Sequence, residues 1–541
     1  MKILRSVAIV FMTGCCMISC KQPSTPVRIS YEALYKTLPF EMPLLQRPVF
    51  PDNQVFLSDF GGVADGVTLN TDAFTRAMDE LDKQQGGTLV VSSGIWLTGP
   101  IVFKSNINLH LQKGALIQFT PDFTQYPLVT SIYEGTESRR CQSPISGHNL
   151  ENIAITGEGS INGSGEAWRP LKKEKVTRNH WHQVVKTGGI VINDNFWFPT
   201  EKALKGYQQS KEKGFGAEMT EADWQAIHDF LRPVMINFVS CKNLLLEGVL
   251  FENSPNWNIH PLLCENVIID GIFVRNPGYA QNGDGLDLES CRNVLVINSV
   301  FDVGDDAICL KSGKDEEGRL RGVPTENILV DNCKVFQGHG GFVVGSEMSG
   351  GVKNILVSNC QFIGTDVGLR FKSCRGRGGV VENIHIRDVH MANIAREALL
   401  FDLFYAQKNS GLPADPVMAD ETTPEFKQIS ITNMTARNVG RAMLFNGLPE
   451  MNIRHIALEN IFITAGYGAH LAESDQISFK NVEIIPVEGA ALVLDNVKNL
   501  QATEFRYPST LENAIDISGS DTENIQLSES AQLKHIACNK D

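Results

Sequence analysis

The chain has 541 residues, of which 42% are hydrophobic and 20% charged, and its formal net charge at pH 7 is −14. This composition is typical of a folded globular protein and excludes an intrinsically disordered one. The acidic balance argues against general nucleic-acid binding, which requires a basic surface. Beyond the N-terminal leader, no apolar run reaches the roughly 18 residues expected of a membrane span.

The first 20 residues are typical of a targeting segment rather than of folded structure. A basic start, Met1 to Arg5, is followed by an apolar stretch, and Met17-Ile18-Ser19-Cys20 resembles a bacterial lipoprotein cleavage box. We therefore expect residues 1–20 to be a lipoprotein signal peptide and Cys20 to be lipidated, with a box ending at Cys15 or an ordinary signal peptide as alternatives. The protein would be exported to the periplasm or cell surface and held to the outer membrane by its lipid anchor alone. Residues 21–50 are expected to form a linker or N-terminal segment.

The first folded element predicted is a helix after Asn70-Thr71-Asp72, which could cap it, through about Gln85. Ala73, Phe74, Ala77, Met78 and Leu81 would share one face of this helix. We expect it to plug the N-terminal end of the domain, where strand edges would otherwise be exposed.

From about residue 100 the sequence repeats a short pattern, an Asn followed by alternating Val, Ile and Leu. The clearest copies begin at Asn152, Asn243, Asn266, Asn293, Asn327, Asn354 and Asn383, and the last six are 23 to 34 residues apart. Each copy is too short to bury its own apolar face, so copies must stack on their neighbours. The β-branched alternating runs indicate strands, and no copy contains a helical repeat. The sequence therefore predicts an all-β fold, a right-handed parallel β-helix over residues 51–541, with the equivalent Asn side chains stacked inside the coil.

The cysteines fit the same repeats. Nine lie beyond the leader, an odd number that cannot all pair within the chain. Five recur at equivalent repeat positions, which indicates a buried stack of free thiols: Cys241, Cys264, Cys291, Cys333 and Cys360. Because no His or Cys cluster has zinc spacing, we expect no structural metal.

An insertion of about residues 166–232 interrupts the repeats. It carries Trp168, Trp181, Trp197 and Trp224, and Thr220-Glu221-Ala222-Asp223 predicts the start of a helix reaching Leu231. The tryptophans could stack on sugar rings, but packing of the insertion onto the coil is the favoured explanation.

Three aspartates lie at related points of successive repeats. Asn282-Gly283-Asp284 precedes Gly304-Asp305-Asp306 by 21 residues (305 − 284), close to one coil. Adjacent residues of an ideal strand point to opposite faces, so Asp305 and Asp306 can share a site only if the backbone bends, as Gly304 permits. Carboxylates held this close keep one of them protonated, which suits the acid and base of glycoside hydrolysis.

One imidazole and two cations follow in the next repeats. His339 is flanked by glycines that leave its ring uncovered, and beside three carboxylates it could tune the acid. Arg370 and Lys372 share one strand face, where they would suit a sugar carboxylate. Lys311, Arg375 and Arg377 could extend this basic strip, whereas Asp287 and Glu289 are expected to support the strand.

These motifs resemble those of the polygalacturonases of glycoside hydrolase family 28, on the pectin-lyase-like β-helix. The matching sequences are Asn282-Gly283-Asp284, Gly304-Asp305-Asp306, Gly338-His339-Gly340 and Arg370-Phe371-Lys372, in the family's order, together with Ser254-Pro255-Asn256-Trp257 and His260. Gly283 departs from the family, which commonly has Thr there.

The resemblance implies a role for each matching residue. Asp305 would be the general acid, Asp284 and Asp306 the pair that activates water, and His339 the group that tunes the acid. Arg370 and Lys372 would bind a galacturonate carboxylate. We also expect Asn282, Lys311 and His260 to contribute to substrate binding. Family members invert the anomeric configuration without a metal or organic cofactor.

We therefore expect an exported monomer that cleaves α-galacturonosyl linkages of pectic polysaccharide. The long insertion could close one end of the cleft and favour exo action. Two alternatives remain open: a pectate or rhamnogalacturonan lyase on the same fold, which would use β-elimination, and a non-catalytic glycan-binding β-helix.

Overall fold

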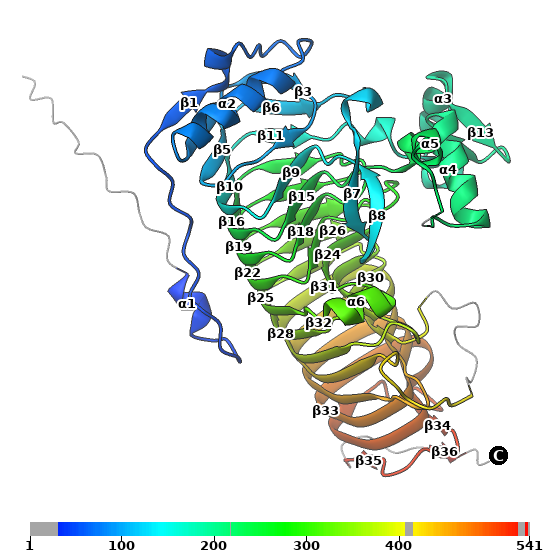
Figure 1. Cartoon of the computed structure of the whole chain (residues 1–541). Helices are drawn as coiled ribbons and strands as arrows, with labels where there is room; N and C mark the ends of the chain where they lie inside the picture. Colours follow the sequence, from blue (N-terminus) through cyan, green and yellow to red (C-terminus); the bar gives the residue numbers. More distant parts are fainter. Residues whose placement is uncertain (1–30, 217, 406–414, 529–535, 539–541) are drawn as a thin grey trace, which may run out of the picture.

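The computed structural model describes residues 31–216, 218–405, 415–528 and 536–538, and it shows the expected right-handed parallel β-helix (Figure 1). The predicted signal peptide and Cys20 lie outside the described residues. Within them, none of the helices combines the length and the apolar character needed to span a membrane.

Each coil contributes one strand to each of three stacks of parallel strands. The first stack contains β1 (Gln54–Phe56), β2 (Gly87–Val91), β5 (Ile107–Leu111), β10 (Glu151–Gly157), β16 (Lys242–Glu247), β19 (Glu265–Asp270), β22 (Arg292–Ile297), β25 (Thr325–Asp331) and β28 (Val352–Ser358). The second contains β3 (Gly94–Thr98), β6 (Ala115–Phe119), β11 (Ser160–Asn162), β17 (Leu250–Glu252), β20 (Phe273–Arg275), β23 (Val300–Val303), β26 (Lys334–Gln337) and β29 (Gln361–Ile363).

The third stack carries the residues of interest. It contains β4 (Ile101–Val102), β9 (Ile145–His148), β15 (Ile236–Val239), β18 (Ile259–Leu262), β21 (Leu286–Glu289), β24 (Asp306–Lys311), β27 (Gly340–Val344) and β30 (Val367–Lys372). All three stacks continue into the long strands β31 (Val380–Asp402), β32 (Glu425–Asn446) and β33 (Ile453–Arg506), because β28, β29 and β30 each pair with part of β31. The coil ends with β34 (Ile515–Ser518), β35 (Gln526–Leu527) and β36 (Ile536–Cys538).

The core is a set of apolar columns that run along the coil axis. Ile153, Leu244, Val267, Val294 and Ile328 pair in register in the first stack, and all are fully buried. In the third stack Phe371 and Phe401 stack with ring centroids 4.6 Å apart. A coil cannot bury these side chains alone, which is the physical reason for the repeat.

The predicted asparagine ladder is present near the starts of the first-stack strands, where most of its members are only partly buried. The side-chain N–H of each Asn donates to the amide oxygen of the Asn one coil earlier, as for Asn243 to Asn152 at 2.9 Å. All seven have φ between 53° and 58°, and only Asn293 is buried. Asn tolerates this left-handed conformation better than most other non-glycine residues, so the local backbone conformation, rather than burial in the core, selects Asn here.

The predicted cysteine stack is confirmed. Cys241, Cys264, Cys291, Cys333 and Cys360 are buried and unpaired. Their Sγ atoms contact backbone carbonyl oxygens, as Cys264 does with Phe238 at 3.2 Å.

Helix α2 (Thr71–Lys83) caps the N-terminal end of the coil, together with the 3₁₀ turn η1 (Leu57–Phe60) (Figure 1). All five predicted apolar residues of α2 are buried. The expected capping by Asn70 is wrong, because its side chain makes no cap hydrogen bond. It instead accepts from the Val63 N–H at 2.7 Å and donates to nearby carbonyls, and so ties the preceding loop to the coil.

Residues 31–50, here called the N-terminal strap, pack along the outside of the first stack and include α1 (Glu32–Tyr35) (Figure 1). Tyr31 and Leu45 cover an outward apolar stripe of the coil: Ala154, Leu245, Ile268, Leu295, Leu329 and Leu356. Arg47 also pairs with Glu247 and, at 3.5 Å, with Asp270. This part of the expected linker is therefore an ordered part of the fold.

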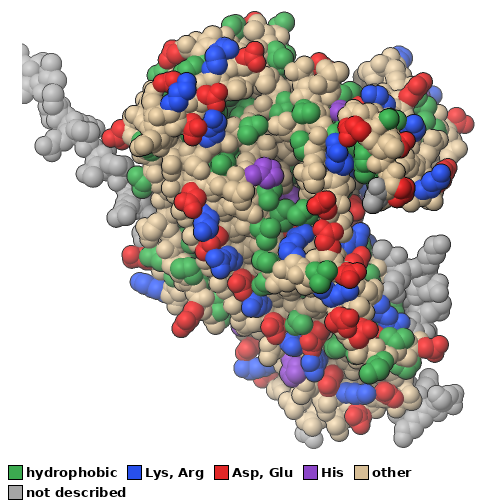
Figure 2. Space-filling view, in the orientation of Figure 1, with side chains coloured by type: hydrophobic (Ala, Val, Ile, Leu, Met, Phe, Trp, Pro, Cys, Tyr) green, Lys and Arg blue, Asp and Glu red, His purple; other side chains and the backbone are tan. Residues whose placement is uncertain are grey.

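The insertion forms a separate lobe beside the N-terminal half of the coil (Figures 1 and 2). It contains α3 (Arg178–Lys186), α4 (Glu201–Glu212), α5 (Glu221–Ala226), the 3₁₀ turns η3 (Gly165–Ala167), η4 (Lys173–Lys175) and η5 (His228–Phe230), and a small antiparallel sheet of β12 (Leu171–Lys172), β13 (Ile190–Ile192) and β14 (Phe196–Phe198). Thr220 and Asp223 form the predicted capping box, but α5 ends at Ala226 rather than Leu231. Trp168, Trp181 and Trp197 are buried, which favours their packing role.

A hairpin that the sequence did not suggest stands beside the third stack. It is formed by β7 (Leu128–Tyr133) and β8 (Thr136–Cys141), which follow the turn η2 (Phe123–Gln125). The carbonyl oxygen of Gly135 at its tip accepts from Arg321 at 3.1 Å, next to α6 (Asp315–Arg321). The hairpin thus forms a wall along the face that carries the three aspartates.

Candidate active site

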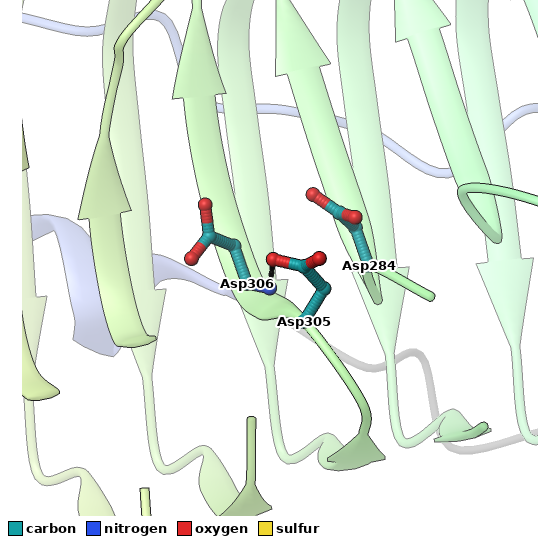
Figure 3. Close-up of side chains that lie close together, drawn as sticks. All are labelled: Asp284, Asp305 and Asp306. Carbon is teal, nitrogen blue, oxygen red and sulfur yellow. Dashed lines mark hydrogen bonds between the residues drawn. The ribbon is translucent and has the colours of Figure 1, made fainter. Parts of the chain in front are cut away.

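The structure brings Asp284, Asp305 and Asp306 together at the entrance of two neighbouring strands of the third stack (Figure 3). Asp284 lies two residues before β21, and Asp306 is the first residue of β24. The register that pairs Leu286 with Ile308 places Asp284 level with Asp306. One carboxylate oxygen from each of the three lies within 4.8 Å of the others.

The expected bend between Asp305 and Asp306 is present. Asp305 lies in the turn before the strand, and its carboxylate accepts a hydrogen bond from the Asp306 backbone N–H at 3.1 Å (Figure 3). Gly304 is needed there for close packing rather than for an unusual φ, since a β-carbon would lie 2.5 Å from the Pro277 carbonyl oxygen. The same loop explains Gly283, where a β-carbon would lie 2.6 Å from that of Ala280.

Asp306 forms the centre of a buried ion-pair cluster. One of its oxygens is 2.9 Å from Arg370 Nη1 and the other is 2.7 Å from Lys372 Nζ, and both cations come from β30. Burial alone would raise the pKa of Asp306, but Lys372, Arg370 and Lys311 overcome it and hold the pKa well below its usual range. Asp306 is therefore ionised at any pH at which the protein works.

Asp284 has the opposite electrostatic environment. Its side chain is buried, and its Oδ1 has no hydrogen-bond partner among the described residues. Burial, followed by the charges of Asp287 and Asp305, raises the pKa of Asp284 well above its usual range. Asp284 therefore has a much higher affinity for a proton than Asp306 does.

Asp305 is the most accessible of the three, with 21% of its side chain exposed. His339 Nδ1 lies 3.1 Å from its Oδ1, and His339 Nε2 lies 3.8 Å from Asp366. The hydrogen bond to Asp305 raises the pKa of His339. Gly338, with φ of 90°, brings the loop so close that the His339 N–H donates to the Asp305 carbonyl oxygen at 3.0 Å.

Two residues predicted to bind substrate are enclosed instead. His260 is fully buried, and its Nε2 is 3.0 Å from Glu289, which also pairs with Arg321. Lys311 is 3.1 Å from Glu347, 3.5 Å from Asp287 and 4.6 Å from the centre of the Trp257 ring. Both therefore support the floor of the site rather than line its open surface.

The expected extension of the basic strip is wrong for a similar reason. Arg375 pairs with Glu450 and Arg377 with Asp315, so neither offers an uncompensated charge to a ligand. Asp287 supports the strand as expected, and burial raises its pKa to about 8. The free positive charge near the aspartates is thus smaller than the sequence indicated.

Asn282 leads from the aspartates into a cavity of about 520 Å³. The hairpin β7–β8, the insertion and the coil enclose it, and sequence reasoning missed the hairpin residues that line it, Tyr133 and Arg140 among them. The Tyr133 hydroxyl group donates to the Asn256 side chain at 3.1 Å. In the sequence, only the long insertion indicated a closed end of the cleft. The hairpin carries no sequence motif that would have predicted it.

The three carboxylate oxygens are spaced closely enough to hold a cation. However, Arg370 and Lys372 already bind both oxygens of Asp306 and supply positive charge at this point. The arrangement suits proton transfer at a sugar bond, with an accessible carboxyl group beside two buried ones.

Comparisons with known proteins agree with this geometry. A sequence profile described as Glycosyl hydrolases family 28 matches residues 227–488. An exo-poly-alpha-D-galacturonosidase of Dickeya chrysanthemi is 28% identical over 71% of this chain and 62% of its own length. An endo-polygalacturonase of Pectobacterium carotovorum is 25% identical over 69% of this chain and 79% of its own length.

Among solved structures, that of a hyperthermoactive exopolygalacturonase from Thermotoga maritima is 34% identical, with a TM-score of 0.68. The match covers 81% of this chain and 93% of that one. With the same β-helix over nearly the whole of that relative, the chain belongs to family 28 of the glycosyl hydrolases and is a glycoside hydrolase.

Proposed function

We propose that this glycoside hydrolase cleaves α-galacturonosyl linkages of pectic polysaccharide and acts from a chain end (exo action). The proposal rests on the differences in burial and in electrostatic environment among the three aspartates. Asp305 reaches the open surface, whereas Asp284 and Asp306 lie buried behind it. The relatives that are named as polygalacturonases supply the substrate class.

In the proposed reaction Asp305 donates its proton to the glycosidic oxygen, and the bond between that oxygen and the anomeric carbon breaks. A water molecule between Asp284 and Asp306 attacks the anomeric carbon from the opposite face and gives up a proton. Asp284 is the better acceptor for this proton, because its proton affinity is raised while that of Asp306 is lowered. Asp306 orients the water, and His339 hydrogen-bonds Asp305 and positions it.

Exo action is supported by the enclosed cavity beyond Asn282. The hairpin and the insertion line this cavity beside the coil, which suits the end of a polymer better than a continuous chain. Two relatives with exo-acting names, at 34% and 28% identity, agree with this, although an endo-acting relative at 25% identity shares the fold.

Elimination by a lyase is disfavoured by the charges in the site. A lyase needs a neutral basic side chain to remove a proton from the sugar. Burial alone would lower the pKa of Arg370 and of Lys372, but both are bound to Asp306 and this carboxylate raises the pKa of each above its usual value, so neither can act as a base.

The test is hydrolysis of defined galacturonate oligomers by the wild type, D305N and a matched control, D302N, three residues earlier on the same coil. D305N should lose turnover by at least about 100-fold, the usual contribution of a general acid, while D302N stays close to wild type. Release of single sugars from the oligomers supports exo action, and unsaturated products would show elimination instead. A D305N variant with the wild-type rate would remove Asp305 from the reaction.

We also propose that the protein is exported and attached to a membrane by lipid on Cys20. The support is the basic, apolar and Cys-containing pattern of residues 1–20.

A further inference from the structure

The strand position that Asp306 occupies in the third stack recurs in the coils that follow it along the axis (Figure 1). The residues at this position in the next coils are, in order, Gly340, Val367, Glu397, Arg441 and Tyr467. Neighbouring parallel strands lie about 4.8 Å apart, so Arg441 is roughly 19 Å and Tyr467 roughly 24 Å from Asp306 along the coil axis. Both residues therefore stand in line with the active site.

Arg441 and Tyr467 form a partly exposed pair. Arg441 Cζ lies 5.3 Å from the centre of the Tyr467 ring, and Tyr467 is 48% exposed. Glu397, on the preceding coil, is 3.5 Å from Arg396 instead, and among the described residues no carboxylate forms an ion pair with Arg441. Burial, followed by the charge of Arg441, lowers the pKa of the nearby His470. The pair thus offers an uncompensated cation beside an accessible aromatic ring.

The backbone next to the pair carries no side chains. Gly440 precedes Arg441, and Gly466 and Gly468 flank Tyr467 on either side. A β-carbon at Gly440, Gly466 or Gly468 would lie within 2.8 Å of a backbone carbonyl oxygen of a neighbouring coil. Close packing of the coils therefore requires glycine at these positions. As a consequence, no side chain stands directly before or after Tyr467 to cover its ring.

The greater part of a bound polymer would pass over these coils. The cavity beyond Asn282 lies on the side of the earlier coils, so a chain whose end sits there extends from Asp306 toward the later ones. On this path Asp402 accepts from the Phe404 N–H and from the Asn446 side chain, each at 3.0 Å. A chain of uronic acids carries one carboxylate on each sugar, and a guanidinium group matches the geometry of a carboxylate.

We infer that Arg441 and Tyr467 form a distal subsite for an acidic polysaccharide. The Arg441 guanidinium binds the carboxylate of a uronic acid several sugars away from the cleaved bond, and the Tyr467 ring packs against the apolar face of a sugar. The inference rests on the proposed function and deepens it, because it gives the enzyme a preference for long acidic chains over short ones.

The experiment compares trigalacturonate, which is too short to reach the pair from Asp306, with octagalacturonate, which spans it. The variants are R441Q, which removes the charge, R441K, which keeps it, and Y467A, which removes the ring. The matched control is R437Q, because Arg437 is an exposed arginine of the same coil that lies on the second stack and packs on Phe462. The measured quantities are kcat and KM for both oligomers, with circular dichroism as a check of folding.

Wild type and R437Q should have a kcat/KM for the octamer that is roughly threefold to tenfold higher than for the trimer, as expected for a partly exposed charge-assisted contact. R441Q and Y467A should lose most of this gain through a higher KM for the octamer, with the trimer unaffected, and R441K should recover part of it. The gain of the wild type should also fall as the salt concentration rises, because salt screens exposed charges.

A wild type that cleaves both oligomers without a gain for the octamer would overturn the inference and leave the proposed function intact. The same holds if a folded R441Q keeps the full gain, or if Y467A keeps it should R441Q fail to fold. A wild type that cleaves neither oligomer would overturn the proposed function and the distal subsite together.

Discussion

Replacement of Asp306 by Asn tests whether one carboxylate holds the floor of the site together. Both of its oxygens are occupied, by Arg370 at 2.9 Å and by Lys372 at 2.7 Å, and Asp306 is only 1% exposed. D306N leaves two buried cations without their counter-ion. Removing one partner of a buried ion pair typically costs about 3–5 kcal/mol, so we expect a loss of that size in the free energy of unfolding.

The pH dependence of the stability difference between wild type and D306N distinguishes the loss of the ion pairs from a general packing defect. The pKa of Asp306 is lower in the folded protein than the value of about 3.9 expected when unfolded. Its stabilising effect is therefore fully present above about pH 4 and is lost as the pH falls through the folded-state pKa. D306N lacks this component, so the difference in stability between wild type and variant should shrink as the pH falls below 4.

The assay is urea-induced unfolding followed by intrinsic fluorescence between pH 3 and pH 7, with D59N as control. Asp59 is exposed and lies in η1, far from the third stack. D59N should match the wild type at each pH. A D306N midpoint equal to that of the wild type at pH 7, or a stability difference that does not change with pH, would refute the argument that the ion pairs of Asp306 stabilise the fold.

Four further outcomes are expected. The acidic limb of the kcat/KM profile should lie above about pH 4, because burial raises the pKa of the proposed base Asp284, which must be ionised to accept a proton; a profile that stays flat as the pH falls to about 4 would contradict the assignment. Proton NMR of the first product formed should show the inverted anomer, whereas retention would indicate a carboxylate nucleophile. Deletion of residues 31–50 should lower stability by roughly 2–4 kcal/mol, since it uncovers the stripe under Tyr31 and Leu45; unfolding midpoints with and without the strap measure this, and equal midpoints would show that the strap contributes nothing. C20A should move the protein from the membrane fraction to the soluble fraction, and an unchanged distribution would exclude lipidation at Cys20.

The fold could be predicted from the sequence because each repeat carries the same residue types at the same positions. Each coil carries an Asn where the backbone needs φ near 55° and apolar residues at alternate positions after it, as from Asn266 and from Asn293. Such a pattern has few structural solutions. The placement of Asp284 and Asp306 on neighbouring coils followed from the repeat length alone.

Other features depend on contacts that no local pattern encodes. The strap joins Arg47 to Glu247, 200 residues away, and the hairpin reaches Arg321 through Gly135. The enclosure of His260 and Lys311 depends on Glu289 and Glu347, whose partners a linear sequence does not reveal. Motif matching located these residues near the site but could not tell an exposed ligand-binding group from a buried support.

The β-helix also restricts how the acid and base carboxylates of this site can differ from one another. Neighbouring parallel strands lie about 4.8 Å apart, so carboxylates at level positions on adjacent coils are brought to the spacing seen here, with oxygens within 4.8 Å. That spacing is shorter than the roughly 6.5–9.5 Å typical of inverting enzymes, and it comes from the fold rather than from the reaction. Distance therefore cannot separate acid from base in this protein. The two roles must therefore be separated by burial and charge: Asp306 is neutralised by two cations, Asp284 is desolvated, and Asp305 is partly exposed beside His339. Because both oxygens of Asp306 are bound and Asp284 is buried, we expect a water molecule between them, rather than either carboxylate, to attack the sugar.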